Sequence, residues 1–159
     1  MDRNRLIEEL ACIVGKEDVL SSRRDLLVYE YDATPDVSMP EVVVFPRDAT
    51  EVSAVMRLAH REGMAVTPRG AGTNLSGGTV PLQGGIVVVL TRMNRVLEID
   101  VASQRAVLEP GVINLELQGM LAPLGYLFAP DPSSQKVTTL GGNVGENAGG
   151  PHCFKYGIT

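Results

Sequence analysis

The stretch that decides the fold is Pro68-Arg69-Gly70-Ala71-Gly72-Thr73-Asn74-Leu75-Ser76-Gly77-Gly78. It cannot continue a helix or strand, because glycine is costly to order and offers no side chain to pack. Such a segment can turn several backbone N–H groups toward one point, and concave arrangements of this kind bind phosphate. We therefore predict a phosphate-binding loop in which at least two of its four glycines, Gly70, Gly72, Gly77 and Gly78, adopt positive φ. A flexible hairpin loop is the alternative.

The side chains of this loop can add to its backbone donors. Thr73, Asn74 and Ser76 carry hydroxyl or amide groups, and Arg69 carries a fixed positive charge. Leu75 is the one residue suited to anchor the loop in a core. Two known phosphate motifs do not fit, because Leu75 replaces the third glycine of G-x-G-x-x-G and no lysine follows Gly77 as in a P-loop.

The flanking sequence predicts an α/β unit. Val42-Val43-Val44-Phe45 is a β-branched run ended by Pro46, which is typical of a buried strand. Residues 65–67 form a second strand that leads into the glycine loop, and residues 86–90 form an apolar strand covered on both faces. The loop therefore follows a strand at its carboxyl end, where α/β folds place ligands.

Helices are predicted from apolar spacing. Residues 6–14 form an amphipathic helix ending near Gly15, residues 21–30 form a second one, and residues 32–40 connect. We expect Thr50 to cap a helix ending at Gly63, and Asn114 to cap another that ends at Pro123 and Gly125. The expected inward residues are Val52, Val55, Met56 and Ala59 in the first of these two helices, and Leu117, Met120, Leu121 and Leu124 in the second. Between the two, residues 95–100 and 105–109 form a hairpin.

Composition excludes several classes of function. The 159 residues are 44% hydrophobic with a net charge of −5 and no basic cluster, which argues against a nucleic-acid partner. The charged N-terminus and short apolar runs predict neither a signal peptide nor a membrane span, so we expect a cytoplasmic protein. His60 is expected on a solvated helix face. His152 and Cys153 are adjacent but lack further ligands nearby, so we expect no metal site. A Cys/His nucleophile pair is left open there.

Two later stretches share the character of the loop. They are Phe128-Ala129-Pro130-Asp131-Pro132-Ser133-Ser134, and Thr139-Leu140-Gly141-Gly142-Asn143 continuing to Ala148-Gly149-Gly150-Pro151. Together with the loop, they resemble the FAD-linked oxidases of the vanillyl-alcohol oxidase and p-cresol methylhydroxylase type. Within that family the similarity is to the FAD-binding subunit of glycolate oxidase and to the D-lactate dehydrogenases. The resemblance spans residues 46–159.

The resemblance implies where FAD is held. It assigns the diphosphate to the first stretch, the flavin and ribityl region to the second, and the rest of the dinucleotide to the third. The implied cofactor-binding residues are Pro68, Arg69, Gly70, Ala71, Gly72, Thr73, Asn74, Ser76 and Gly77; Pro130, Asp131, Ser133 and Ser134; and Thr139, Gly141, Gly142, Asn143, Ala148, Gly149 and Gly150. It also implies that FAD is bound non-covalently, because relatives that link FAD through this loop have a histidine where this chain has Thr73.

The implied fold is the first lobe of such an FAD-binding domain, with a small, mostly parallel sheet flanked by helices, followed by the start of a mixed or antiparallel lobe. We expect an N-terminal helical segment at residues 1–40 and an FAD-binding domain at 41–159 that is incomplete at its C-terminus. The chain would be an N-terminal fragment, inactive alone and able to self-associate, with its catalytic residues in the missing part.

The implied function is oxidation of a small 2-hydroxy acid, of the glycolate or D-lactate type, by hydride transfer to FAD. Electron-accepting partner subunits would hold the protein peripherally at a membrane. The alternative is a non-enzymatic nucleotide- or phosphate-binding module.

Overall fold

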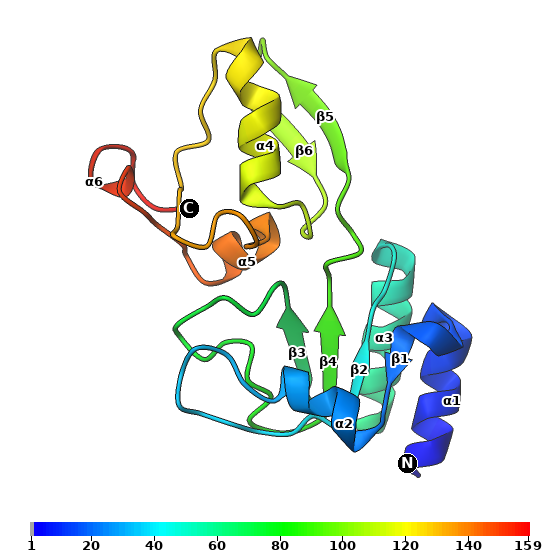
Figure 1. The fold of residues 1–159 in the computed structure, drawn as a ribbon. Coiled ribbons are helices and arrows are strands. Elements are labelled where there is room, and N and C mark those ends of the chain that lie inside the picture. The colour runs from blue at the N-terminus through cyan, green and yellow to red at the C-terminus, as the bar shows by residue number, and fades with distance from the viewer. Residues whose placement is uncertain (1) are drawn as a thin grey trace. The chain divides into compact units, whose positions relative to one another are not determined.

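A computed structural model describes residues 2–159 and contains two compact units, one ending at Arg92 and the other beginning at Met93. The first unit runs α1 (Arg3–Val14), β1 (Val19–Leu20), α2 (Arg23–Leu26), β2 (Val42–Val44), α3 (Ala49–Glu62), β3 (Val66–Arg69) and β4 (Ile86–Val89), with 3-10 turns at Lys16–Asp18 and Leu27–Tyr29 (Figure 1). The second runs β5 (Val96–Asp100), β6 (Arg105–Leu108), α4 (Asn114–Leu121), a 3-10 turn (Ala122–Leu124), α5 (Leu140–Gly145) and α6 (Cys153–Tyr156).

The first unit is built on a four-stranded sheet in the order β1-β2-β4-β3. Strands β2, β4 and β3 are parallel, with Val43 opposite Val87 and Pro68 opposite Val88, and β1 pairs antiparallel with β2. Figure 1 shows the arrows of β3 and β4 pointing the same way. The glycine loop begins directly after Arg69, at the carboxyl end of β3, as the sequence predicts.

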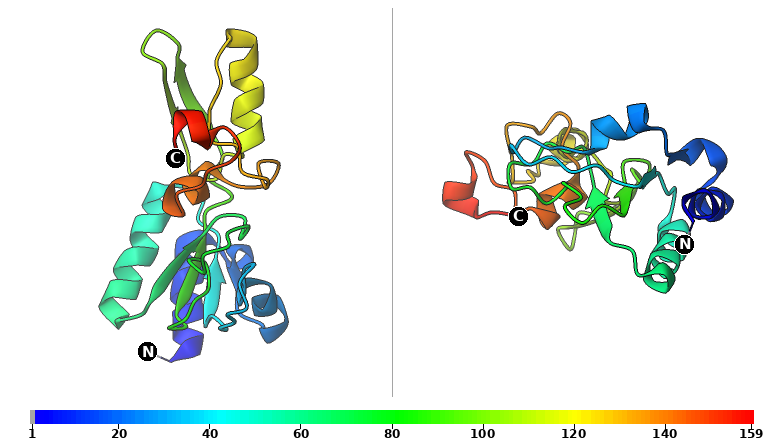
Figure 2. Two further views of the ribbon diagram at one scale, coloured as in Figure 1. Left: turned by 90° about the vertical axis from the view of Figure 1, so that its left-hand side faces the viewer. Right: turned by 90° about the horizontal axis from the view of Figure 1, so that it is seen from below.

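Both faces of this sheet are covered, which explains why its central strands are continuous apolar runs. On one face, α1 and α3 pack against the even-numbered residues of β2 and β4. The left view of Figure 2 shows α3 and α2 on opposite sides of this sheet. On the other, Leu26 of α2 packs against Val43, Val87 and Val89. All three residues of β2 are buried. Strands β2, β3 and β4 and the two long helices of this unit are therefore where the sequence places them, whereas β1 was not predicted.

The second unit is a hairpin with a helix packed against it. Strands β5 and β6 pair antiparallel, with a register shift between Val96 and Glu98, and the turn between them contains Gln104 at φ 53°. Leu117 of α4 joins Val112 and Leu140 in a small apolar core on the hairpin. The predicted hairpin and helix are confirmed.

Three details of the helices differ from prediction. Asp48, not Thr50, caps α3, because its Oδ1 accepts the backbone N–H groups of Thr50 and Glu51 at 2.8 and 3.0 Å. Asn114 is the first residue of α4 and caps nothing. Residues 21–30 contain only one α-helical turn followed by a 3-10 turn.

Three side chains that were predicted to face inward are about half exposed: Met56, Met120 and Leu124. In α3, Leu58 is buried beside Val55 and Ala59, which leaves Met56 on the solvent side. In α4, buried Leu117 and partly buried Leu121 face the core, and the tighter 3-10 turn that follows directs Leu124 away from it.

Candidate cofactor-binding site

The glycine loop, residues 70–78, lies in the first unit and has the predicted backbone. Gly72 and Gly77 have φ of 69° and 80°, so at least two of its four glycines adopt positive φ, as predicted. Leu75, by contrast, is 79% exposed and anchors nothing. What fixes the loop is a set of polar contacts beneath it.

The Arg69 side chain is folded under the loop and is almost completely buried. Its Nη1 donates to the backbone oxygen of Tyr31 at 2.9 Å and to Thr79 Oγ1 at 3.3 Å, and its guanidinium lies 5.6 Å from the centre of the Tyr29 ring. Burial lowers the pKa of the Arg69 guanidinium below its usual value, while Tyr29 and Asp32 oppose that shift. The group nevertheless stays charged, as arginine does in proteins.

Gly72 lies directly over this guanidinium. A Cβ at Gly72 would overlap Arg69, and its φ of 69° already disfavours any side chain. A Cβ at Gly77 would meet nothing within 4 Å, so that position needs glycine for its backbone alone. The two glycines are therefore required for different reasons.

Asp32 is a second buried charged residue beside the loop, and the sequence alone did not identify it. Its carboxylate accepts hydrogen bonds from Thr34 N at 2.8 Å, Thr34 Oγ1 at 2.6 Å and Asn74 Nδ2 at 2.6 Å. Burial raises the pKa of Asp32, but these hydrogen bonds outweigh it and hold that pKa below its usual value. The carboxylate is thus kept ionised.

The other two predicted stretches lie in the second unit, and the structure brings parts of them together. A Cβ at Gly150 would overlap the Asp131 backbone and carboxylate, and Asp131 Oδ2 lies 2.6 Å from His152 Nδ1. Pro130 is buried, and its carbonyl accepts a hydrogen bond from Asn114 Nδ2 at 2.9 Å. His152 directly precedes α6, whose first residue is Cys153.

The run of glycines after Thr139 forms a helix that the sequence did not predict. Thr139 Oγ1 caps α5 by accepting the Gly142 N–H at 3.2 Å. Gly141 donates to the carbonyl of Pro110 at 2.8 Å, and a Cβ at Gly141 would overlap that proline. Glycine is therefore needed at this position because another part of the backbone passes close to it.

Two asparagines of this region are fully buried, and each has one unpaired atom. Asn143 Oδ1 accepts from Thr138 Oγ1 at 2.8 Å, but Asn143 Nδ2 and Asn114 Oδ1 have no hydrogen-bond partner among the described residues. A buried donor and a buried acceptor left unpaired are uncommon in folded proteins.

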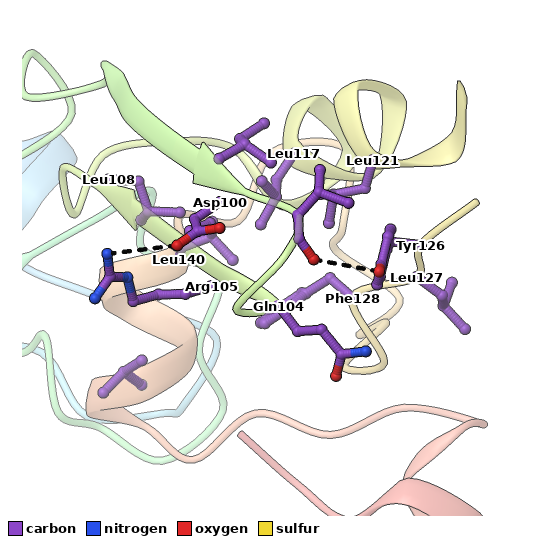
Figure 3. A pocket seen from close by; sticks show the side chains of 14 residues that line it. Asp100, Gln104, Arg105, Leu108, Leu117, Leu121, Tyr126, Leu127, Phe128 and Leu140 are labelled. Atoms are coloured by element: carbon purple, nitrogen blue, oxygen red, sulfur yellow. Dashed lines mark hydrogen bonds and ion pairs between the residues drawn. The ribbon is translucent and has the colours of Figure 1, made fainter. Parts of the chain in front are cut away.

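A cavity of about 360 Å³ lies elsewhere in the second unit, between the hairpin and α4 (Figure 3). Its wall is mostly apolar, with Leu108, Leu117 and Phe128 among the lining residues. At its rim, Tyr126 donates to the carbonyl of Val101 at 3.3 Å, and Arg105 lies 3.9 Å from Asp100. Such a lining suits an apolar group and not a diphosphate.

Metal binding finds no support in residues 2–159, where no three His, Cys, Asp or Glu side chains cluster closely enough to hold an ion. His60 is exposed on α3, as predicted. Over the same residues, no helix is long and apolar enough to cross a membrane.

The fold and the glycine loop define a flavin-nucleotide-binding domain. Residues 40–159 match the family of FAD binding domains, and the chain belongs to that family. FAD is therefore its cofactor. The family resemblance found in the sequence is confirmed.

Individual relatives show which members of this family the chain is similar to. The chain is 43% identical to glycolate oxidase subunit GlcD of Bacillus subtilis over 153 residues, which is 96% of this chain and 33% of GlcD. It is 41% identical to D-lactate dehydrogenase of Anaerostipes hadrus over 120 residues, which is 76% of this chain and 25% of that protein. The chain thus spans about a third or less of the length of these relatives.

The fold is also found in solved structures. That of p-cresol methylhydroxylase matches with a TM-score of 0.79 at 20% identity, over 91% of this chain and 29% of that chain. The predicted fold class, an α/β domain of the p-cresol methylhydroxylase type, is therefore correct.

Proposed function

We propose that this chain is the FAD-binding portion of a longer flavoprotein that oxidises a small 2-hydroxy acid of the glycolate or D-lactate type. In that reaction the acid loses a hydride from C2 and a proton from its hydroxyl group and becomes the 2-oxo acid, and bound FAD accepts the hydride. The observation that carries the proposal is the positive φ of Gly72 and Gly77 in the loop after β3, in a chain 43% identical to a glycolate oxidase subunit.

The first unit contributes the diphosphate contacts. Backbone N–H groups in residues 70–78 turn toward the phosphates, and hydroxyl groups of the loop add donors, so that no lysine is required. The residues assigned here are Pro68, Arg69, Gly70, Ala71, Gly72, Thr73, Asn74, Ser76 and Gly77. For the second unit we propose contacts to the same cofactor from Pro130, Asp131, Ser133, Ser134, Thr139, Gly141, Gly142, Asn143, Ala148, Gly149 and Gly150.

The catalytic acid and base lie outside residues 1–159 in this proposal. Residues 1–159 alone should accordingly bind FAD weakly and oxidise nothing, because a cofactor held by part of its site loses much of its contact area. Electron-accepting partner subunits complete the enzyme. Titration of the isolated chain with FAD, followed by flavin fluorescence, checks this: sub-micromolar binding or any turnover would contradict it.

The function is tested on the whole protein. We expect a yellow preparation whose flavin bands bleach on anaerobic mixing with glycolate or D-lactate and return when an artificial electron acceptor is added. A yellow protein that neither acid reduces would overturn the substrate class. A colourless protein that still binds ADP would instead support the nucleotide-binding module.

A further inference from the structure

The glycine loop is held in place by a short segment that precedes the residues matching the family. The match begins at residue 40, whereas Tyr31 and Asp32 lie before it. Tyr31 accepts a hydrogen bond from Arg69 through its carbonyl, and Asp32 accepts one from Asn74 through its carboxylate. The backbone N–H of Ala33 also donates to the carbonyl of Asn74 at 3.3 Å. The loop is thus fastened at both its beginning and its middle to the same short segment.

These contacts form a closed ring of hydrogen bonds. Arg69 Nη1 donates to Thr79 Oγ1 at 3.3 Å, and Thr79 Oγ1 donates to Asn74 Oδ1 at 2.8 Å. Asn74 Nδ2 then donates to Asp32 Oδ2 at 2.6 Å. The ring is completed through the backbone of Tyr31, whose oxygen accepts from Arg69 at 2.9 Å.

The chemistry of the ring fixes the direction of every bond in it. A carboxylate only accepts and a guanidinium only donates, so the amide of Asn74 must turn its nitrogen toward Asp32 and its oxygen toward Thr79. Both ends of the Asn74 side chain are therefore engaged within the protein. The two charges at the ends of the chain of bonds are opposite, and Asp32 favours the charged form of Arg69.

This arrangement also explains how the loop amides become available. Asp32 holds Asn74 in the middle of the loop, and the guanidinium of Arg69 lies under Gly72, so the loop rests on two charged residues. Ordering a loop rich in glycine is costly in conformational entropy, and a network ordered before the ligand arrives removes that cost from binding.

We propose that Asp32 is a positioning residue for cofactor binding: through Asn74 and Thr79, and together with Arg69, it holds the glycine loop in the shape that receives the diphosphate. In this role, the side chains of Asn74 and Arg69 support the loop through their hydrogen bonds. Backbone N–H groups of the loop contact the phosphates. The inference rests on the proposed placement of the FAD diphosphate at this loop.

An exchange of partners between Asp32 and Asn74 tests the proposal. In the whole protein, Asp32→Asn sets two amide nitrogens against each other, and Asn74→Asp sets two carboxylates against each other. The double variant Asp32→Asn/Asn74→Asp restores one amide and one carboxylate, with the acceptor still facing Thr79. Asp36→Asn is the matched control, because Asp36 is exposed in the same segment and makes the same change of charge.

Two measurements are made on each variant. Hydrogen–deuterium exchange of residues 70–78 is followed in FAD-free protein, and FAD affinity is measured by equilibrium titration. Each single variant should speed loop exchange and weaken FAD binding by about tenfold or more, as expected for loss of one charge-assisted hydrogen bond. The double variant should recover most of both effects, while Asp36→Asn changes neither. Unchanged exchange in β2 and β4 shows that the variants are folded.

The outcomes separate the two proposals. Loop exchange that is the same in all variants, or a double variant no better than either single one, overturns the positioning role. Faster loop exchange with unchanged FAD affinity also overturns it. If wild-type protein binds no FAD at all, the proposed function fails, and the exchange data alone then decide whether the ring orders the loop.

Discussion

Asp131 holds His152 at two points: its Oδ1 accepts the backbone N–H of His152 at 3.2 Å, and its Oδ2 lies 2.6 Å from the imidazole Nδ1. This contact joins the polar stretch around Pro130 to the end of the glycine-rich stretch, two segments assigned to the cofactor. Gly150 passes so close to Asp131 that no side chain fits between them. Protonated His152 would make the contact an ion pair as well.

The first prediction concerns this contact. Asp131→Ala should raise the deuterium-exchange rate of the His152 amide by about tenfold, because the variant removes the acceptor of that N–H. Ser133→Ala, at an exposed position in the same stretch, should leave the rate unchanged. Equal rates in the two variants would show that the segment is held by something else.

The second prediction compares two glycines of the loop. Gly77→Ala should cost about 1–2 kcal/mol of stability, the usual cost of a left-handed alanine. Gly72→Ala should cost clearly more, because its Cβ must also displace the buried Arg69 guanidinium. Thermal unfolding and FAD titration of both variants in the whole protein measure the difference. Equal losses would mean that Arg69 moves away freely.

The third prediction is that FAD is bound without a covalent bond. The loop has Thr73 and no histidine, and residues 128–134 contain no cysteine, so neither stretch offers a side chain of the kind that links flavin in relatives. Acid precipitation of the whole protein should therefore release the yellow colour into the supernatant. A pellet that keeps the flavin after washing would contradict this.

The fourth prediction follows from the lowered pKa of Asp32. Because its folded pKa lies below the unfolded value of about 3.9, the stability that ionised Asp32 contributes is complete above that value. It is lost as the pH falls through the folded pKa. Wild-type protein should therefore be more stable than Asp32→Asn at pH 7, and the difference should shrink below about pH 4. Urea unfolding at several pH values measures it, and a difference that stays constant down to pH 3 would refute the role of the charge.

The sequence was most informative where a pattern is local. The β-branched run at residues 42–45 and the glycines of the loop each predict their structure from neighbours in the chain, and both predictions are confirmed. The sequence was less informative about which side chains of a helix face the core. Met56 and Met120 satisfy apolar spacing, yet both are about half exposed, because neighbouring positions occupy the core. Whether an apolar side chain at the edge of an apolar stripe is buried depends on the residues that pack opposite it. Spacing along the sequence does not identify those residues.

Asp32 was out of reach of such reasoning. It lies 42 residues before its partner Asn74, in a stretch whose prolines and polar residues indicate only a connecting loop. Nothing in a single sequence marks one aspartate among several as buried. The helix through Gly141 and Gly142 was missed for a related reason, since its capping by Thr139 and its contact with Pro110 depend on the folded chain.

The ring beneath the loop has a consequence for exchanging parts between related proteins. A chimera joined at residue 40, where the family match begins, would take Asn74 and Thr79 from one parent and Asp32 from the other. Such a hybrid would keep every residue of the loop and still lose its shape whenever the parents differ at position 32. A junction placed before Tyr29 would keep the whole ring from one parent. Positions 32 and 74 should therefore be taken together from the same parent.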